Sequence, residues 1–155
     1  MSIFREMGVK ETGDKMSEKV VYSIAKAYGV IERTVSDALH MFGLSAGKFN
    51  ILMTVKHVGR AEGIAQNGIS KHLLVTTSNM TRMLDKLEKE GLVERRALPG
   101  DRRVNKVFIT KKGSELLDNA WPSYKKTVDE LVDSAYSLRN KVEIAGLLGQ
   151  LKKGA

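Results

Sequence analysis

A short amphipathic segment, residues 77–90, constrains the fold of this chain more than any other stretch. Its apolar residues recur at positions i, i+3, i+4 and i+7: Met80, Met83, Leu84 and Leu87. At helical spacing they form one narrow stripe that must face a core. Thr76 can cap the first turn and Gly91 supplies a left-handed stop, which together predict a helix over 77–90. The opposite face carries hydroxyl and charged side chains: Ser78, Arg82, Asp85 and Lys89, with Thr81 and Lys86 on the flanks.

A basic β-hairpin is predicted directly after this helix. Residues 92–96 have the composition of a strand, 97–102 are rich in turn-forming residues, and 104–109 alternate as a second strand. Arg102 and Arg103 lie near the tip of this hairpin. A helix followed by a basic two-stranded ribbon is the plan of a winged helix-turn-helix.

A supporting helix is expected before the amphipathic one. Ile69 and Leu73 share one face four residues apart, which predicts a short helix over 65–74, preceded by a loop over 59–63. In a helix-turn-helix unit the first, short helix supports and the second reads the nucleic acid. Lys71 on the supporting helix is placed to meet a phosphate.

A long helix is predicted upstream of this unit. Apolar residues step by three and four along 21–42, which indicates one helix that begins at Ser17 and ends at Gly43. Such a helix usually needs more partner surface than one small domain supplies. Ser45 can then cap another helix over 46–58.

Two more helices are predicted downstream. Thr110 can cap a long helix and Ser137 a shorter one, each with apolar residues at helical spacing. Pro122 lies inside the first of them, where it removes one backbone donor and is expected to kink the helix without ending it. The predicted fold class is therefore mainly α with a small β-hairpin wing, a winged helix-turn-helix with long N- and C-terminal helices suited to dimerisation.

The predicted organisation has four parts. They are a flexible N-terminal arm, an N-terminal dimerisation helix, a winged helix-turn-helix lobe and a pair of C-terminal dimerisation helices, over residues 1–16, 17–43, 44–110 and 111–155 respectively.

The positive charge of the chain is concentrated on the predicted helix and hairpin. The 155 residues carry a formal net charge of +8, and residues 71–112 contribute +6, from 11 Lys and Arg minus 5 Asp and Glu. A basic patch on a helix and a hairpin is the electrostatic footprint of nucleic-acid binding. The charge therefore predicts a nucleic acid as partner, and the reading helix with its wing favours double-stranded DNA.

Composition also excludes several classes of protein. The chain has no cysteine, which excludes disulfides, thiolate metal sites and thiol-based sensing. No apolar run approaches the roughly 18 residues of a membrane span, and residues 1–15 lack the apolar core of a secretion signal. The expected location is the cytoplasm, with no membrane partner.

The segment NMTRMLDKLEKEGLVERR, followed by PGDRRVNKVFITKKG, resembles the MarR (multiple antibiotic resistance regulator) family of transcription factors. The resemblance extends from about residue 17 onward and includes the long helix before this unit and the two helices after it. Its most specific element is the wing motif D-x-R, here residues 101–103, at its distance from GLVER.

The resemblance implies a homodimer whose N- and C-terminal helices interlock, so that two winged lobes meet one pseudo-palindromic DNA site. It implies that Arg103 reaches the minor groove and that Asp85 pairs with Arg103 and holds the wing, with Asp101 as a second wing-positioning residue. It further implies release from DNA by a small anionic or phenolic effector, and a repressor as the most common role.

The residue types on the reading helix suggest which side chains meet DNA. Arg bonds bidentately to guanine, Asn to adenine, and hydroxyls to bases or phosphates. We expect base contacts from Ser78 and Arg82. The residues expected to divide between bases and phosphates are Thr76, Thr77, Asn79 and Thr81. Those expected to position the protein on phosphates are Lys71, Lys86, Arg102 and Lys106.

Other chemistry has weaker support. His40, His57 and His72 fall on three different predicted helices without a zinc-ligand spacing, so neither a metal nor another cofactor is predicted. No nucleophile elbow, P-loop or paired-carboxylate arrangement is present, and an enzyme is not predicted. The aromatic residues Tyr28, Trp121 and Tyr124 fit either an effector pocket or an ordinary interface core.

Two other functions remain open from the sequence. One is a winged-helix module that docks an acidic protein and reads no base, although the hydroxyl-rich helix face argues against it. The other is a metal or ligand sensor whose role on DNA is secondary.

Overall fold

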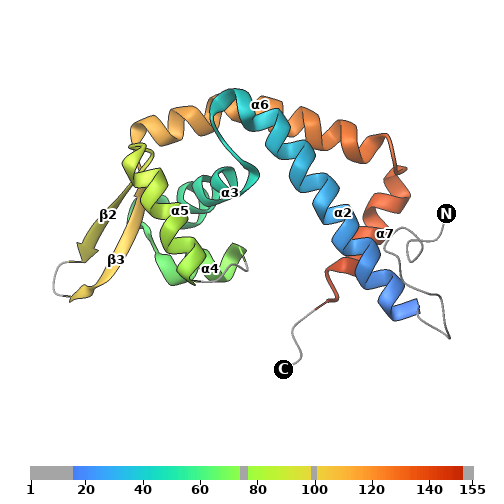
Figure 1. Cartoon of the computed structure of the whole chain (residues 1–155), viewed down its shortest axis with the longest axis horizontal. Coiled ribbons are helices and arrows are strands. Elements are labelled where there is room, and N and C mark those ends of the chain that lie inside the picture. The colour runs from blue at the N-terminus through green and yellow to red at the C-terminus, as the bar shows by residue number, and fades with distance from the viewer. Residues whose placement is uncertain (1–15, 74–76, 99–100, 152–155) are drawn as a thin grey trace.

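The computed structural model describes residues 16–73, 77–98 and 101–151, without the side chains of residues 77, 98 and 101–105. Helix α6 (Lys111–Asp133) runs across the molecule and joins its two ends (Figure 1). One end is a compact lobe that carries the hairpin. The other end consists of the N-terminal half of α2 (Met16–Leu39) and of α7 (Leu138–Leu148). Helix α2 also packs along α6.

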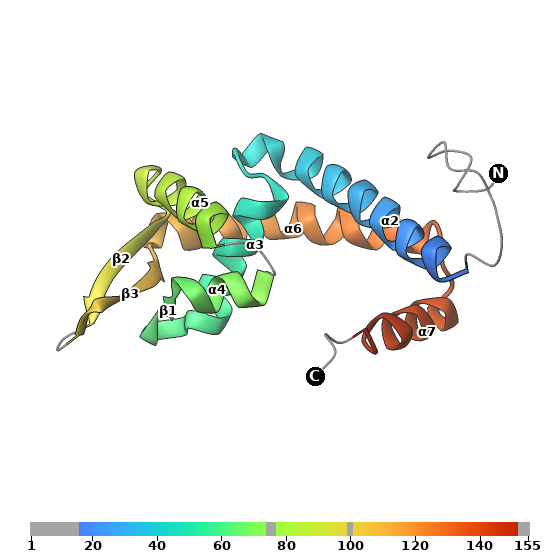
Figure 2. The ribbon, with the colours of Figure 1, turned by 60° about the horizontal axis from the view of Figure 1, so that its bottom comes forward.

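The lobe combines three helices with a small antiparallel sheet. Its helices are α3 (Ala46–Thr54), α4 (Gln66–Leu73) and α5 (Thr77–Lys89). Its strands, in their order across the sheet, are β1 (Ile64–Ala65), β3 (Asp101–Ile109) and β2 (Val93–Leu98). The hairpin of β2 and β3 projects away from α2 and α7, as Figure 2 shows. The predicted fold class, mainly α with a β-hairpin wing, is confirmed.

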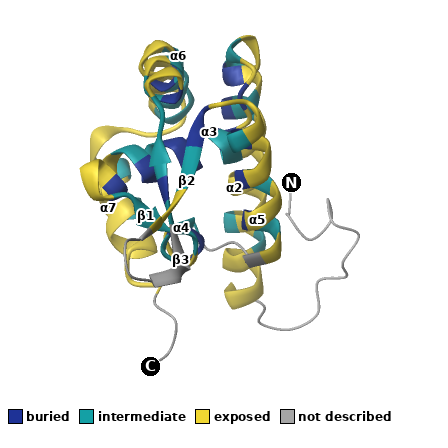
Figure 3. Cartoon of the chain, turned by 90° about the vertical axis from the view of Figure 1, so that its left-hand side faces the viewer, coloured by how far each residue is buried: buried dark blue, intermediate teal, exposed yellow. Residues whose placement is uncertain are grey.

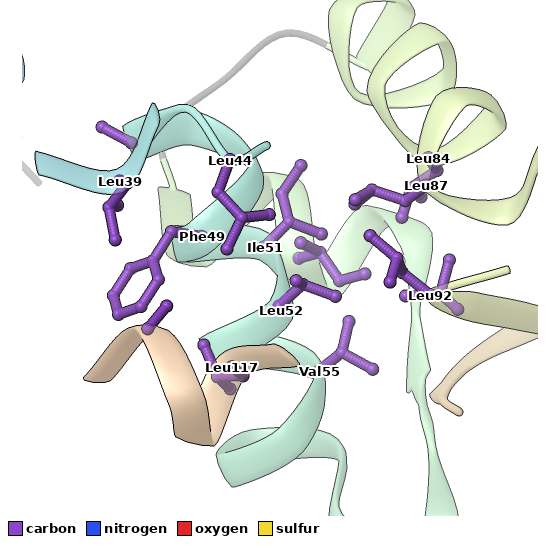
Figure 4. Close-up of a cluster of buried hydrophobic side chains, with 14 of the residues drawn as sticks. Leu39, Leu44, Phe49, Ile51, Leu52, Val55, Leu84, Leu87, Leu92 and Leu117 are labelled. Carbon is purple, nitrogen blue, oxygen red and sulfur yellow. The ribbon is translucent and has the colours of Figure 1, made fainter. Parts of the chain in front are cut away.

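One apolar core unites the lobe with α6. The predicted stripe on α5 faces it, because Met80, Leu84 and Leu87 have no exposed surface, while Met83 packs against its edge. Leucines of α5 and of α6 meet the side chains of α3 in this core (Figure 4). Burial of a Leu or Met side chain contributes about 1.5–3 kcal/mol, so this stripe fixes which face of α5 points outward.

The wing strands are longer than the sequence predicts. Residues 97, 98, 101 and 102, predicted as turn, belong to β2 and β3, as does residue 103. The register runs from Val93 opposite Ile109 to Leu98 opposite Asp101, with one irregularity between Ala97 and Leu98. Pairing across the hairpin satisfies backbone donors and acceptors of residues whose side chains alone favour a turn. Residues 99 and 100 lie outside the described part of the chain.

The predicted loop over 59–63 and the predicted helix start at residue 65 are both wrong in detail. A 3-10 turn occupies Arg60–Glu62, and after Gly63 the residues Ile64 and Ala65 form β1, which pairs with β3. A two-residue strand has no periodicity of its own, so the pairing with β3 alone creates it. Helix α4 therefore begins at Gln66.

The ends of α2 and α3 confirm two of the predicted capping residues and contradict a third. Gly43 has φ 68° and follows a 3-10 turn at the end of α2, and the Ser45 hydroxyl accepts from the Lys48 N–H at 3.3 Å. Helix α2 begins at Met16, so Ser17 lies inside its first turn instead of capping it. The helix predicted over 46–58 is α-helical only to Thr54 and continues as a π-helical turn, Val55–Gly59.

The C-terminal helices begin where the sequence predicts. The Thr110 hydroxyl accepts from the Gly113 N–H at 3.0 Å, and Ser137 forms a capping box with Asn140. Helix α6 continues through Pro122. Among the described residues, no helix is both long and apolar enough to cross a membrane.

The end of the molecule that lies away from the hairpin exposes apolar surface. Figure 3 shows α7 and much of α2 as exposed. The large apolar residues exposed there include Met16, Val20 and Val21 of α2, together with Leu138, Val142, Leu147, Leu148 and Leu151 of α7 and the residues after it.

Candidate nucleic-acid interface

Burial of the α5 stripe leaves a polar face of that helix in solvent. The exposed residues of α5 are Ser78, Thr81, Arg82, Asp85, Lys86 and Lys89, while Asn79 is half-buried. The Gln66 side-chain amide at the start of α4 donates to the Thr81 hydroxyl at 2.6 Å. This bond ties the two helices of the helix-turn-helix unit together at their polar edge. Arg82 donates to the Asn79 side-chain carbonyl at 3.3 Å on the same face.

Arg95 on β2 connects the reading helix to the base of the wing. Its guanidinium lies 2.7 Å from Asp85 Oδ1 and 2.8 Å from Glu88 Oε2. Its backbone N–H also donates to Glu88 Oε1 at 2.9 Å. The expected partner of Asp85, Arg103, has its side chain outside the described residues, so that pairing stays a prediction. The resemblance did not point to Arg95, although its position in GLVER marks it as the first cation after the helix.

Glu90, just after α5, is a third acidic group that is paired with a cation from another element. Lys48 of α3 contacts both carboxylate oxygens of Glu90, at 2.6 and 2.8 Å, and Lys112 donates to the Glu90 backbone carbonyl at 2.8 Å. In the described part of the chain, Lys71, Arg82 and Lys86 form no salt bridge. The exposed face of α5 and the adjacent end of α4 therefore present net positive charge to an anionic partner.

The predicted phosphate contacts lie on three different elements. Lys71 is exposed in the last turn of α4 and Lys86 is exposed on α5. Lys106 on β3 is half-buried and donates to the Glu62 carbonyl at 3.0 Å, so it also fastens the turn before β1 to the wing. Arg96 on β2, which the sequence did not single out, lies over the Phe108 ring at 4.8 Å.

Several predicted contact residues fall where the structure gives no side-chain description. Thr76 lies outside the described residues. For four others the backbone is described and the side chain is not: Thr77, Asp101, Arg102 and Arg103. Their roles rest on the sequence alone.

Residues of α2, α3 and α6 line a groove of about 270 Å³. Tyr28 and Tyr124 line it, as one reading of the sequence predicts, but Trp121 lines a different cavity beside His57 and Asp118. The rings of Trp121 and Tyr124 lie 5.4 Å apart, but the three aromatic residues do not line one cavity. Phe49 is fully buried on α3 and stacks on Tyr124 with ring centroids 4.6 Å apart.

The histidines are dispersed, as the sequence predicts. His40 lies in the turn after α2, His57 in the π-helical turn and His72 in α4. Across residues 16–73, 77–98 and 101–151, no group of three His, Asp or Glu side chains is arranged to hold a metal ion.

Arg95 gives a first testable prediction. Arg95→Ala leaves Asp85 and Glu88 without their shared cation next to the DNA-facing surface, so we expect duplex affinity to fall about tenfold or more. The free energy of unfolding should fall by only about 1 kcal/mol, because solvent screens pairs of this exposure. Fluorescence anisotropy with labelled duplex and thermal unfolding measure the two effects.

The matched control is Arg96→Ala, which removes the neighbouring cation on the same strand. Arg96 is 61% exposed and pairs with Glu94 of its own strand, not with the reading helix. Equal losses of affinity for the two variants would show that charge alone matters and that Arg95 does not position the helix and the wing.

The tightly packed helix pair, the outward basic face of its second helix and the adjoining hairpin define a DNA-binding protein of the winged helix-turn-helix class. Comparison with known proteins gives the family. The sequence model described as "MarR family" matches residues 44–104. The HTH-type transcriptional regulator MhqR of Bacillus subtilis is 32% identical over 116 residues, covering 75% of this chain and 78% of that protein.

Solved structures agree with this comparison. The transcriptional regulator BldR from Sulfolobus solfataricus has a TM-score of 0.74 and 28% identity, over 90% of this chain and 100% of that chain. MepR of S. aureus, solved in a complex with DNA, has a TM-score of 0.73 at 20% identity, over 84% of this chain and 97% of that one, which shows the fold alone.

The chain belongs to the MarR family and is a DNA-binding transcriptional regulator, not an enzyme. The resemblance noted in the sequence is thereby confirmed.

Proposed function

We propose that this regulator is a homodimeric repressor that binds a pseudo-palindromic duplex and is released from it by a small molecule. The observation that carries the proposal is the exposed face of α5. There Arg82 and Lys86 stand among hydroxyl side chains, while Asp85 and Glu88 are paired with Arg95.

In this proposal α5 enters the major groove of DNA. Ser78 and Arg82 contact base edges, Lys71 and Lys86 contact phosphates, and the wing with Arg103 reaches the adjacent minor groove. Each bidentate base contact contributes about 1–3 kcal/mol of discrimination, whereas phosphate contacts add affinity with no preference for sequence.

Dimerisation is supported by the exposed apolar residues of α2 and α7, which lie at the end of the molecule away from the hairpin (Figures 1 and 3). A second copy that covers these residues removes them from water and leaves both lobes facing outward. A twofold dimer would present two reading helices to half-sites about 10 bp apart.

Release by a small molecule is supported by the groove between α2, α3 and α6. A ligand there contacts the helices proposed for dimerisation and, through α3, the core of the lobe. The ligand weakens DNA binding only if it binds the conformation in which the two lobes are spaced for DNA less tightly than it binds another conformation.

The reading residues are tested by selecting duplexes from random sequence and measuring single-base variants of the selected site. We expect Arg82→Ala to reduce the preference for one base at one position of the site by about 5- to 150-fold, which corresponds to 1–3 kcal/mol. Arg103→Ala should lose affinity evenly across sequences. The slope of log affinity against log salt concentration should fall by about one.

Arg33→Ala, an exposed arginine on α2, is the control and should bind every duplex like the parent. If selection enriches no motif and both test variants bind duplex like the parent, the chain reads no base, and docking to an acidic protein becomes the better explanation. Transcription from a promoter that contains the selected site tests repression directly.

A further inference from the structure

We infer that the effector of this regulator is an aromatic organic cation, a planar ring bearing a protonated amine or amidine, bound in the groove between α2, α3 and α6. The inference rests on the proposed release by a small molecule and names the chemistry of that molecule.

The charge lining the groove is negative. Among the described residues that line it, Glu32 alone carries a formal charge, and the other polar groups are Asn50 and the hydroxyls of Tyr28 and Tyr124. Glu32 is exposed, and its carboxylate attracts a cation and repels an anion that enters the groove. The chain therefore selects against the anionic ligands that the family resemblance suggests.

Glu32 is held in place by a short hydrogen-bond chain. The Ser36 hydroxyl donates to Glu32 Oε1 at 3.3 Å and accepts from the Ala46 N–H in the first turn of α3 at 3.0 Å. This chain links the carboxylate on α2 to the start of α3. A cation bound to Glu32 thus contacts a carboxylate of α2 that is linked through Ser36 to the start of α3.

The groove also has walls suited to an aromatic cation. Tyr124 is backed by the buried Phe49 ring, which stacks on it at 4.6 Å, and Tyr28 lies on α2 opposite. The faces of aromatic rings attract cations within about 6 Å. Ile31, Val128 and Leu131 supply apolar surface for the ring of the ligand.

The size of the groove limits the ligand further. Its volume of about 270 Å³ lies near the lower end of typical ligand sites, about 300–1,000 Å³. A single bicyclic ring with one charged group fits this space better than a long chain or a ligand with several rings.

The experiment compares three probes with the same skeleton and different charge: 2-naphthamidine (cationic), 2-naphthamide (neutral) and 2-naphthoate (anionic). Calorimetric titration of the full-length protein should give the tightest binding for the amidine, by about tenfold or more over the naphthoate. Glu32→Gln should weaken amidine binding about tenfold, and Glu32→Lys should reverse the order of amidine and naphthoate.

Asp37→Asn is the matched control, because it removes an exposed carboxylate of the same helix that does not line the groove. It should leave the order and the affinities unchanged. The inference is overturned if the naphthoate binds as tightly as the amidine, if Glu32→Gln has no effect, or if the amidine does not bind.

Duplex binding measured without any probe separates the two proposals. If the parent and Glu32→Gln bind duplex equally while the probes show no preference for the cation, this inference alone fails. If the parent ignores duplex DNA, the proposed function fails, whatever the probes do.

Discussion

Gly113→Ala is expected to lower the free energy of unfolding by about 3 kcal/mol, at the upper end of the range for overpacked sites. A Cβ built at Gly113 would lie 2.1 Å from the Leu92 carbonyl oxygen and 2.9 Å from its carbon, a clash with backbone that no side-chain rotation relieves. The midpoint of thermal unfolding should drop by about 6–12 °C in a chain of this size.

The same substitution should also weaken duplex binding. The first turn of α6 holds the segment just after α5, because the Thr110 hydroxyl donates to the Gly91 carbonyl at 2.8 Å and the Thr110 N–H to the Leu92 carbonyl at 3.1 Å. If the first turn of α6 must move away from Leu92, the end of the reading helix loses this support. Fluorescence anisotropy of labelled duplex, measured below the temperature of unfolding, separates this loss of DNA affinity from loss of the folded state.

The control for Gly113→Ala is Gly29→Ala, the same change within another helix. A Cβ at Gly29 meets nothing within 4 Å, so alanine should leave stability unchanged or raise it by up to about 1 kcal/mol through its higher helix propensity. Equal stability of Gly113→Ala and the parent would mean that the first turn of α6 does not pack closely against Leu92.

The double variant Leu138→Glu/Val142→Glu is expected to convert the proposed dimer to a monomer. The two side chains are 76% and 68% exposed in the single chain, so charges there should not disturb its fold. In a twofold dimer the native Leu138 and Val142 side chains would be buried in both copies, so the double variant removes four apolar contacts. The dimer dissociation constant should therefore rise by at least about 1,000-fold. Sedimentation equilibrium measures this change.

Duplex affinity should fall with the dimer, by about 100-fold or more, because the two lobes then bind half-sites independently. The control is Arg139→Glu, which changes the net charge equally at an exposed position of α7 and removes no apolar side chain. If the test variant stays dimeric, or if it binds a two-half-site duplex as tightly as the control, α7 is not part of the dimer interface.

Much of the reading helix could be predicted because its signals are local. The spacing of Met80, Leu84 and Leu87 allows one buried face, and that choice places Ser78 and Arg82 in solvent without knowledge of any other element. The caps at Ser45, Thr110 and Ser137 are equally local, because each side chain accepts from a backbone N–H three residues later.

Contacts between distant segments could not be predicted in this way. Arg95 and Asp85 are ten residues apart on different elements, and only the angle between α5 and β2 decides that they pair. The strand at Ile64 and Ala65 exists because β3 lies beside it, and the separation of Trp121 from Tyr28 follows from how α6 crosses α2 and α3.

The sequence by itself determined the helices, the wing, the family and the outward face of α5, because these depend on the periodicity and capping of neighbouring residues. Tertiary structure alone decided which carboxylates Arg95 neutralises, which aromatic residues share the groove and that Glu32 supplies its charge. Those outcomes depend on distances between segments far apart along the chain, and such distances are set by packing of the shared core.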